Sequence, residues 1–191
     1  MQPSWKIPEE IERPFRDGLD HAAKRRAAEL HALVNELSTQ QLAGIIQLSC
    51  YVTAYTAIDV VDRRWPTDAH ARRMAQRTAE GGTTSFAEFG VTEENVYLFI
   101  SRCALGSTPY EDVFADIFPD PTEFFAAVFF ITVKVLAAFT PKGKDMGEFL
   151  DLMEAALEGA WLLDLNLLPA LMFRARLPQE ALNPKANEAS S

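Results

Sequence analysis

Two carboxylates in this sequence have a spacing that could support metal-dependent chemistry. Asp59 and Asp62 are three positions apart in a predicted helix, so their side chains should project from the same side. Two carboxylates placed in this way can bind Mg²⁺, which can in turn bind a diphosphate group. One hypothesis is therefore a magnesium-dependent helical enzyme. Asp59 also precedes Arg63 by four positions, and we favour the simpler interpretation of an ion pair on a helix surface.

The other nucleophilic and ligand-type residues form no recognisable catalytic or metal-binding motif. The three histidines, His21, His31 and His70, lack the spacing of zinc or di-iron ligands, and we expect His21 and His31 at the surface. Cys50 and Cys103 lie in apolar stretches, which predicts buried, unreactive thiols in a reducing compartment. The sequence therefore predicts a cytoplasmic protein without a cofactor, and it favours a protein that is not an enzyme.

Lys134 interrupts an otherwise apolar segment, from Phe124 to Phe139. An ammonium group in such a segment must pair with an acid, lose its proton or extend its charged end to water. We expect it to extend to water; the alternatives are an ion pair with Asp59 or Asp164, or a functional lysine in a pocket. A pocket between helices is the basis of a second hypothesis, binding of a small apolar molecule. The pocket candidates are Lys134 and two phenylalanines of the same segment, Phe125 and Phe129.

Acidic residues are concentrated in two regions of the chain. The net charge is −9, and the stretch from Glu80 to Glu123 contains nine acids and one base. The stretch from Asp145 to Asp164 contains six acids and no base. Such surfaces repel phosphates and attract cationic proteins, so we expect a protein partner and no nucleic acid. The leading hypothesis is a non-enzymatic interaction module that binds a basic protein, with these candidate residues: Glu93, Glu94, Glu111, Asp112 and Asp116.

In the segments that must position these residues, apolar residues recur mainly at three- and four-residue steps, which is typical of helices. No strand-like alternation of apolar and polar residues is present. We expect an all-α, single-domain, irregular bundle of seven or eight helices. Two of them, 38–63 and 122–139, are apolar almost all round and should be central. The Ser38-Thr39-Gln40-Gln41 sequence predicts a capping box, and Thr92 predicts another helix start. Pro14 and Gly18 predict a break or bend within a long first helical stretch that runs to Leu37.

The helix predicted from Asp145 to about Leu163 has one apolar side and one acidic side. At 100° per residue, the apolar stripe contains Met146, Phe149, Leu150 and Met153. The acidic side, which we expect to face solvent, contains Asp145, Glu148, Asp151, Glu154 and Glu158.

Three further expectations concern membranes, self-association and the chain end. The apolar segment 124–139 is shorter than the roughly 20 residues of a membrane span, so no membrane association is expected. The segment Leu162–Phe173 is apolar enough to form a homodimer contact. Residues 1–178 should form the helical domain, and residues 179–191 a polar, disordered tail.

Overall fold

The computed structural model describes residues 7–56, 68–80, 89–105 and 120–159. These residues form seven α-helices and contain no β-strand, which confirms the all-α prediction. The helices are α1 (Glu9–Ala23), α2 (Ala27–Glu36), α3 (Thr39–Tyr55), α4 (Asp68–Glu80), α6 (Glu93–Leu105), α8 (Pro121–Phe139) and α9 (Met146–Gly159). The proposed homodimer segment, residues 162–173, and the tail, residues 179–191, lie outside the described residues.

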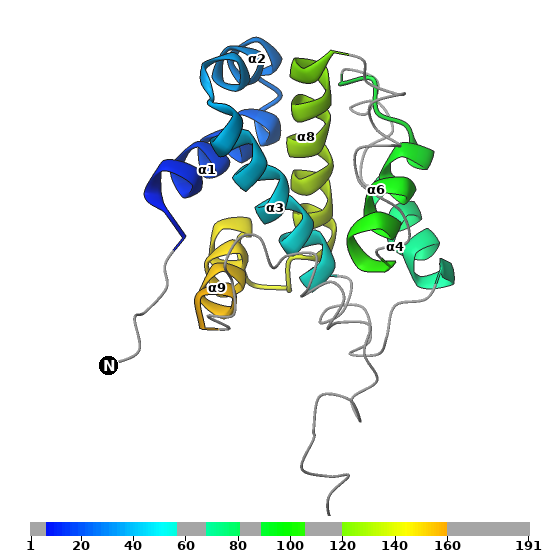
Figure 1. Cartoon of the computed structure of the whole chain (residues 1–191). Coiled ribbons are helices and arrows are strands. Elements are labelled where there is room, and N and C mark those ends of the chain that lie inside the picture. Colours follow the sequence, from blue (N-terminus) through cyan, green and yellow to red (C-terminus); the bar gives the residue numbers. More distant parts are fainter. Residues whose placement is uncertain (1–6, 57–67, 81–88, 106–119, 160–191) are drawn as a thin grey trace, which may run out of the picture.

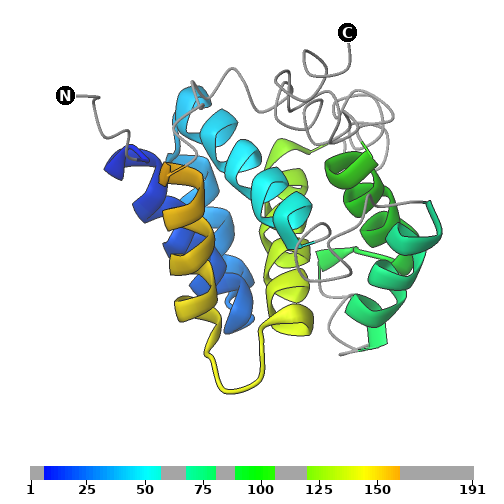
Figure 2. The same ribbon diagram turned by 90° about the horizontal axis from the view of Figure 1, so that it is seen from below.

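Helix α8 is at the centre of the bundle. It packs against α1, α2, α3, α4 and α9, and most of its side chains from Phe125 to Phe139 are buried. Figure 1 shows α1, α2 and α9 on one side of α8, and α4 and α6 on the other. The view in Figure 2 shows the same division, with α9 beside α1. Helix α3 bridges the two sides, because it contacts α1, α6, α8 and α9.

Reciprocal side-chain hydrogen bonds cap the N-terminal ends of three of these helices, α3, α6 and α9. The Gln41 backbone N–H donates to Ser38 Oγ at 3.3 Å, and the Ser38 N–H donates to Gln41 Oε1 at 2.9 Å, so the predicted capping box is confirmed. Thr92 and Asn95 cap α6 in the same way. Asp145 accepts from the Glu148 N–H at 2.8 Å and thereby begins α9. These bonds satisfy backbone donors that have no partner within the first helical turn.

Helix α1 has no break near Pro14 or Gly18, so the expectation of a break there is wrong. Both residues lie inside the continuous helix α1, and the chain instead leaves the helix at Lys24. Arg25 takes the left-handed conformation, with φ of 57°, and the Arg26 N–H donates to the His21 carbonyl at 2.9 Å. This is the hydrogen-bond pattern of a Schellman helix end, although glycine is the residue usually found in the left-handed position. The long first stretch is therefore two helices, α1 and α2.

Gly18 permits close contact between α1 and α8. A Cβ atom at Gly18 would lie 2.3 Å from Cε1 of Phe129. Phe129 is fully buried, and its ring centroid lies 6.3 Å from that of Phe15 on α1. The aromatic ring thus occupies the space that a larger residue would need, which explains why a glycine is tolerated within a helix.

Helix α8 is also long and apolar enough to cross a membrane. It has 19 residues, and its most apolar window has a mean hydropathy of 1.8. However, 67% of that window is buried inside the bundle. The central helix of a soluble protein has the same properties, so α8 is only weak evidence for membrane association.

Candidate functional site

Helix α9 has one buried and one exposed side. Phe149, Leu150 and Met153 are buried in the core, and the Sδ atom of Met153 lies 3.9 Å from the hydroxyl of Thr56, the residue that follows α3. Four residues at positions i, i+3, i+4 and i+7 are exposed and therefore share one side of the helix. We call this side the α9 outer face; it consists of Glu148, Asp151, Leu152 and Ala155.

The α9 outer face combines an apolar side chain with acidic residues. Leu152 is 49% exposed, and it is the one large hydrophobic residue that is exposed in the described part of the chain. Glu148 and Asp151 lie beside it, Asp145 precedes the helix, and all three are exposed. No lysine or arginine occurs from Asp145 to Gly159. The face therefore presents a hydrophobic contact surrounded by negative charge.

Arg16 of α1 connects the α9 outer face to the rest of the bundle. Its guanidinium donates to Asp151 Oδ1 at 2.7 Å and to the Glu154 carboxylate. It also donates to Glu12 Oε1, one turn earlier on α1, at 3.1 Å. One cation thus contacts three carboxylates from two helices, and this contact holds α9 against α1.

Glu154 corrects the prediction for the acidic side of this helix. The sequence pattern placed it in solvent, but the residue is only 7% exposed, and its Oε1 atom is buried without a hydrogen-bond partner. Burial raises the pKa of Glu154 to about 7. The nearby Arg16 charge opposes this rise, whereas the carboxylates of Glu12 and Asp151 add to it.

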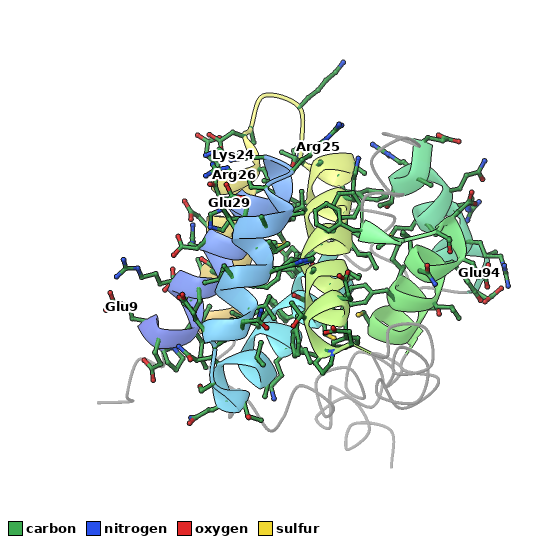
Figure 3. All side chains as sticks on the ribbon, turned by 90° about the horizontal axis from the view of Figure 1, so that it is seen from above. Glu9, Lys24, Arg25, Arg26, Glu29 and Glu94 are labelled. Atoms are coloured by element: carbon green, nitrogen blue, oxygen red, sulfur yellow. The ribbon has the colours of Figure 1, made fainter. Side chains whose placement is uncertain are left out.

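The acidic residues predicted on α6 form a second, smaller negative region. Glu93 and Glu94 are exposed in the first turn of α6, where the partial positive charge of the helix end favours carboxylates. Figure 3 shows Glu94 on the side of the molecule opposite Glu9 of α1. The other three candidates, Glu111, Asp112 and Asp116, lie outside the described residues.

Basic residues on α4 lie close to this α6 region. Helix α4 packs against α6 and has three exposed arginines, Arg72, Arg73 and Arg77. The Arg72 guanidinium lies 4.0 Å from the centroid of the Tyr97 ring on α6. Arg72 Nε donates to Asp68 at 3.1 Å, and the Tyr97 hydroxyl donates to the same carboxylate. The α6 acids are therefore part of a mixed-charge surface, unlike those of the α9 outer face.

The pocket residues suggested by the sequence lie in the packed interior. Phe129 contacts Phe15 and Gly18, and Phe125 packs edge-on against Phe124 with ring centroids 5.0 Å apart. Lys134 is partly exposed, and its ammonium lies 5.6 Å from the centroid of the Phe130 ring. Burial and the positive charge of Arg25 lower the pKa of Lys134. Side chains of the protein thus occupy the space beside Phe129, and no observation favours a ligand there.

The carboxylates suggested for metal binding fall in a part of the chain that the structure does not describe. Asp59, Asp62 and the proposed Lys134 partner Asp164 lie outside the described residues. Within residues 7–56, 68–80, 89–105 and 120–159, no three His, Cys, Asp or Glu side chains form a metal-binding group. His31 is half-buried, with Nε2 3.8 Å from Glu123 Oε1, and His21 is also half-buried.

Two features of the site were missed by the sequence analysis. The exposure of Leu152 could have been recognised, because at 100° per residue it lies between Glu148 and Asp145 on the polar side of the predicted helix. The role of Arg16 could not have been recognised, because it depends on the packing of α1 against α9.

The sequence matches no known protein family, and comparison of the chain with curated proteins and with solved structures gives no match.

Proposed function

We propose that this protein is a non-enzymatic interaction module whose α9 outer face binds a basic partner protein. The observation that carries the proposal is the exposed Leu152 side chain, which lies among carboxylates on a helix without any basic residue. Burial of an exposed leucine at an interface is favourable because it removes apolar surface from water. The surrounding acids favour a partner segment that presents lysine or arginine around an apolar residue.

The α9 outer face is a stronger candidate than the acidic start of α6. Glu93 and Glu94 already have a structural role at the positive end of their own helix, and arginines of α4 lie nearby. Asp151 and Glu154 of α9 contact one basic residue in the described structure, Arg16 of α1. Arg16 also contacts Glu12. Negative charge therefore remains in excess around Leu152.

Affinity capture with two matched variants tests the proposal. The α9 variant combines Glu148→Gln and Leu152→Gln, and the control combines Glu93→Gln and Glu94→Gln on α6. Glutamine at position 148 can still accept the capping hydrogen bond that Asp145 now donates to Glu148. We expect the α9 variant to bind a captured basic protein at least about tenfold more weakly than wild type does. The control should bind it as wild type does.

Salt provides a second criterion in the same experiment. Exposed charges interact weakly above about 0.5 M salt, so capture by wild type should fall steeply between about 0.05 M and 0.5 M NaCl. If no basic protein is captured, or if wild type and the α9 variant capture it equally, then the α9 outer face is not the binding surface.

A further inference from the structure

Three carboxylates share one guanidinium at the edge of the α9 outer face. Arg16 donates to Asp151 Oδ1 at 2.7 Å, to Glu12 Oε1 at 3.1 Å and to the Glu154 carboxylate. We call these four residues the Arg16 cluster. The Asp151 side chain belongs to the outer face and is 64% exposed, whereas Glu154, three positions later on the same helix, is buried. Arg16 therefore links the charge of a buried carboxyl to the charge that an approaching protein meets.

The buried Glu154 carboxyl is poorly suited to a permanent negative charge. Its Oε1 atom has no hydrogen-bond partner in the described structure, and a buried charge is costly unless it is both paired and hydrogen-bonded. Its one counter-charge, Arg16, is divided among three carboxylates. Burial accordingly raises the pKa of Glu154 to about 7. Glu154 thus exchanges its proton near neutral pH, where both of its charge states are populated.

The neighbouring helices add no further charge beside Glu154 in the described structure. Helix α9 packs against α8 and α3 as well as contacting α1, and α3 contains no Asp, Glu, His, Lys or Arg. Helix α8 has two charged residues, Glu123 and Lys134. Glu123 lies 3.8 Å from His31 of α2, and the Lys134 ammonium lies 5.6 Å from the centroid of the Phe130 ring. The protonation of Glu154 is therefore governed by the other members of the Arg16 cluster.

We infer that Glu154 controls the α9 outer face by its proton, so that the face binds a cationic segment more tightly when Glu154 is ionised. With Glu154 protonated, two carboxylates and one guanidinium give the Arg16 cluster a net charge of −1, and a third carboxylate makes it −2. Ionised Glu154 also competes with Asp151 for Arg16, which leaves Asp151 freer to pair with a lysine or arginine of the partner. This inference rests on the proposed function of the face, and it predicts tighter binding above neutral pH than below it.

Binding of a defined cationic peptide at two pH values tests the inference. The probe is a synthetic peptide with blocked ends, in which one leucine is flanked by lysines; these keep their charge, because the pKa of lysine is about 10.4. From about pH 5.5 to about pH 8.5, we expect the affinity of wild type to rise about three- to fivefold more than that of Glu154→Gln, which stays neutral. The matched control, Glu148→Gln, removes an acid outside the Arg16 cluster. It should weaken binding at both pH values and keep the pH dependence of wild type.

The inference and the proposed function fail in different ways in this experiment. Equal pH dependence in wild type and Glu154→Gln would overturn control by Glu154 and leave the α9 outer face as the binding surface. If wild type does not bind the peptide at either pH, or if Leu152→Gln binds it as tightly as wild type does, then the proposed function fails and the inference fails with it.

A ¹³C NMR titration of the Glu154 carboxyl in the free, full-length protein gives a readout that needs no peptide. We expect the carboxyl signal to shift with a midpoint at about pH 7. A midpoint near that of an ordinary glutamate, about 4.3, would overturn the inference by itself, because Glu154 would then be ionised at both pH values of the binding experiment.

Discussion

At the scale of single residues, Glu154 is the ionisable group with the clearest conflict between its burial and its charge. It is buried beside Arg16, yet Glu12 and Asp151 compete for the same guanidinium, and burial keeps its pKa at about 7. A carboxyl whose pKa is higher in the folded protein than in the unfolded chain binds its proton more tightly in the folded protein. Its contribution to stability is therefore present at low pH and is lost as the pH rises toward 7.

The Glu154→Gln variant should reveal this contribution. Glutamine has nearly the same shape, stays neutral and can still accept a hydrogen bond from Arg16. Relative to the variant, we expect wild type to lose about 1 to 3 kcal/mol of unfolding free energy between about pH 4.5 and pH 7, with little further change at higher pH. Urea denaturation of both proteins across this range measures the difference. A difference that is independent of pH would mean that Glu154 is ionised throughout.

The location of Glu154 shows what a helical pattern cannot predict for one residue. On the predicted helix it lies 80° from the centre of the apolar stripe, at the boundary between buried and exposed positions. Which side of such a boundary becomes buried depends on the neighbouring helix. Here α1 supplies Arg16, so a residue predicted to be exposed becomes the buried end of an ion pair.

At the scale of helices, the contact between α1 and α8 depends on Gly18. In the Gly18→Ala variant, the new methyl group would overlap the Phe129 ring. We expect a loss of about 1 to 3 kcal/mol of stability from overpacking, although alanine itself favours helix by up to about 1 kcal/mol. Chemical denaturation measures this loss. Adding Phe129→Leu should recover part of it, with a coupling energy of about 1 kcal/mol or more.

Gly147→Ala is the matched control for this experiment. Gly147 is an exposed helical glycine, and a Cβ atom there would lie 3.1 Å from Asp145 Oδ1 without meeting an aromatic ring. Its effect on stability should be smaller than about 1 kcal/mol in either direction. If the two alanine variants lose the same stability, or if the Gly18 and Phe129 effects are additive, then the close contact does not account for the glycine.

The sequence was most informative about helices that begin with polar caps. The starts of α3 and α6 follow from Ser38 and Thr92, because short-range hydrogen bonds define them. The boundary between α1 and α2 was missed, because Lys24, Arg25 and Arg26 include neither glycine nor proline. The left-handed conformation of Arg25 has no signal in its residue type. It follows from the way α1 and α2 both pack on α8.

At the scale of the whole molecule, charge divides the described surface into unlike regions. Figure 3 shows Lys24 and Arg26 close together, Arg25 nearer to α8, and Glu94 far from all three on α6. Two of these three bases already pair with Asp20. The α9 outer face contains no basic residue, and its exposed leucine lies beside two acids. A cationic partner should therefore orient toward α9 as it approaches.

The composition predicted an acidic protein, but it could not identify which acids form an interaction surface. That distinction depends on three-dimensional neighbours: α4 arginines beside the α6 acids, Arg16 beside Glu154, and no base among the exposed residues of α9. The apolar α8 was predicted correctly as a central helix because its composition leaves no polar side to face water.

Site-specific photo-cross-linking tests the central claim most directly. A benzophenone amino acid would replace Leu152 in one protein, Glu94 in a second and the exposed Ala43 of α3 in a third. We expect irradiation at low salt to attach a basic protein to position 152, and to give no such product from positions 94 and 43. Cross-linking from position 94 but not 152, or equally from all three positions, would contradict binding through the α9 outer face.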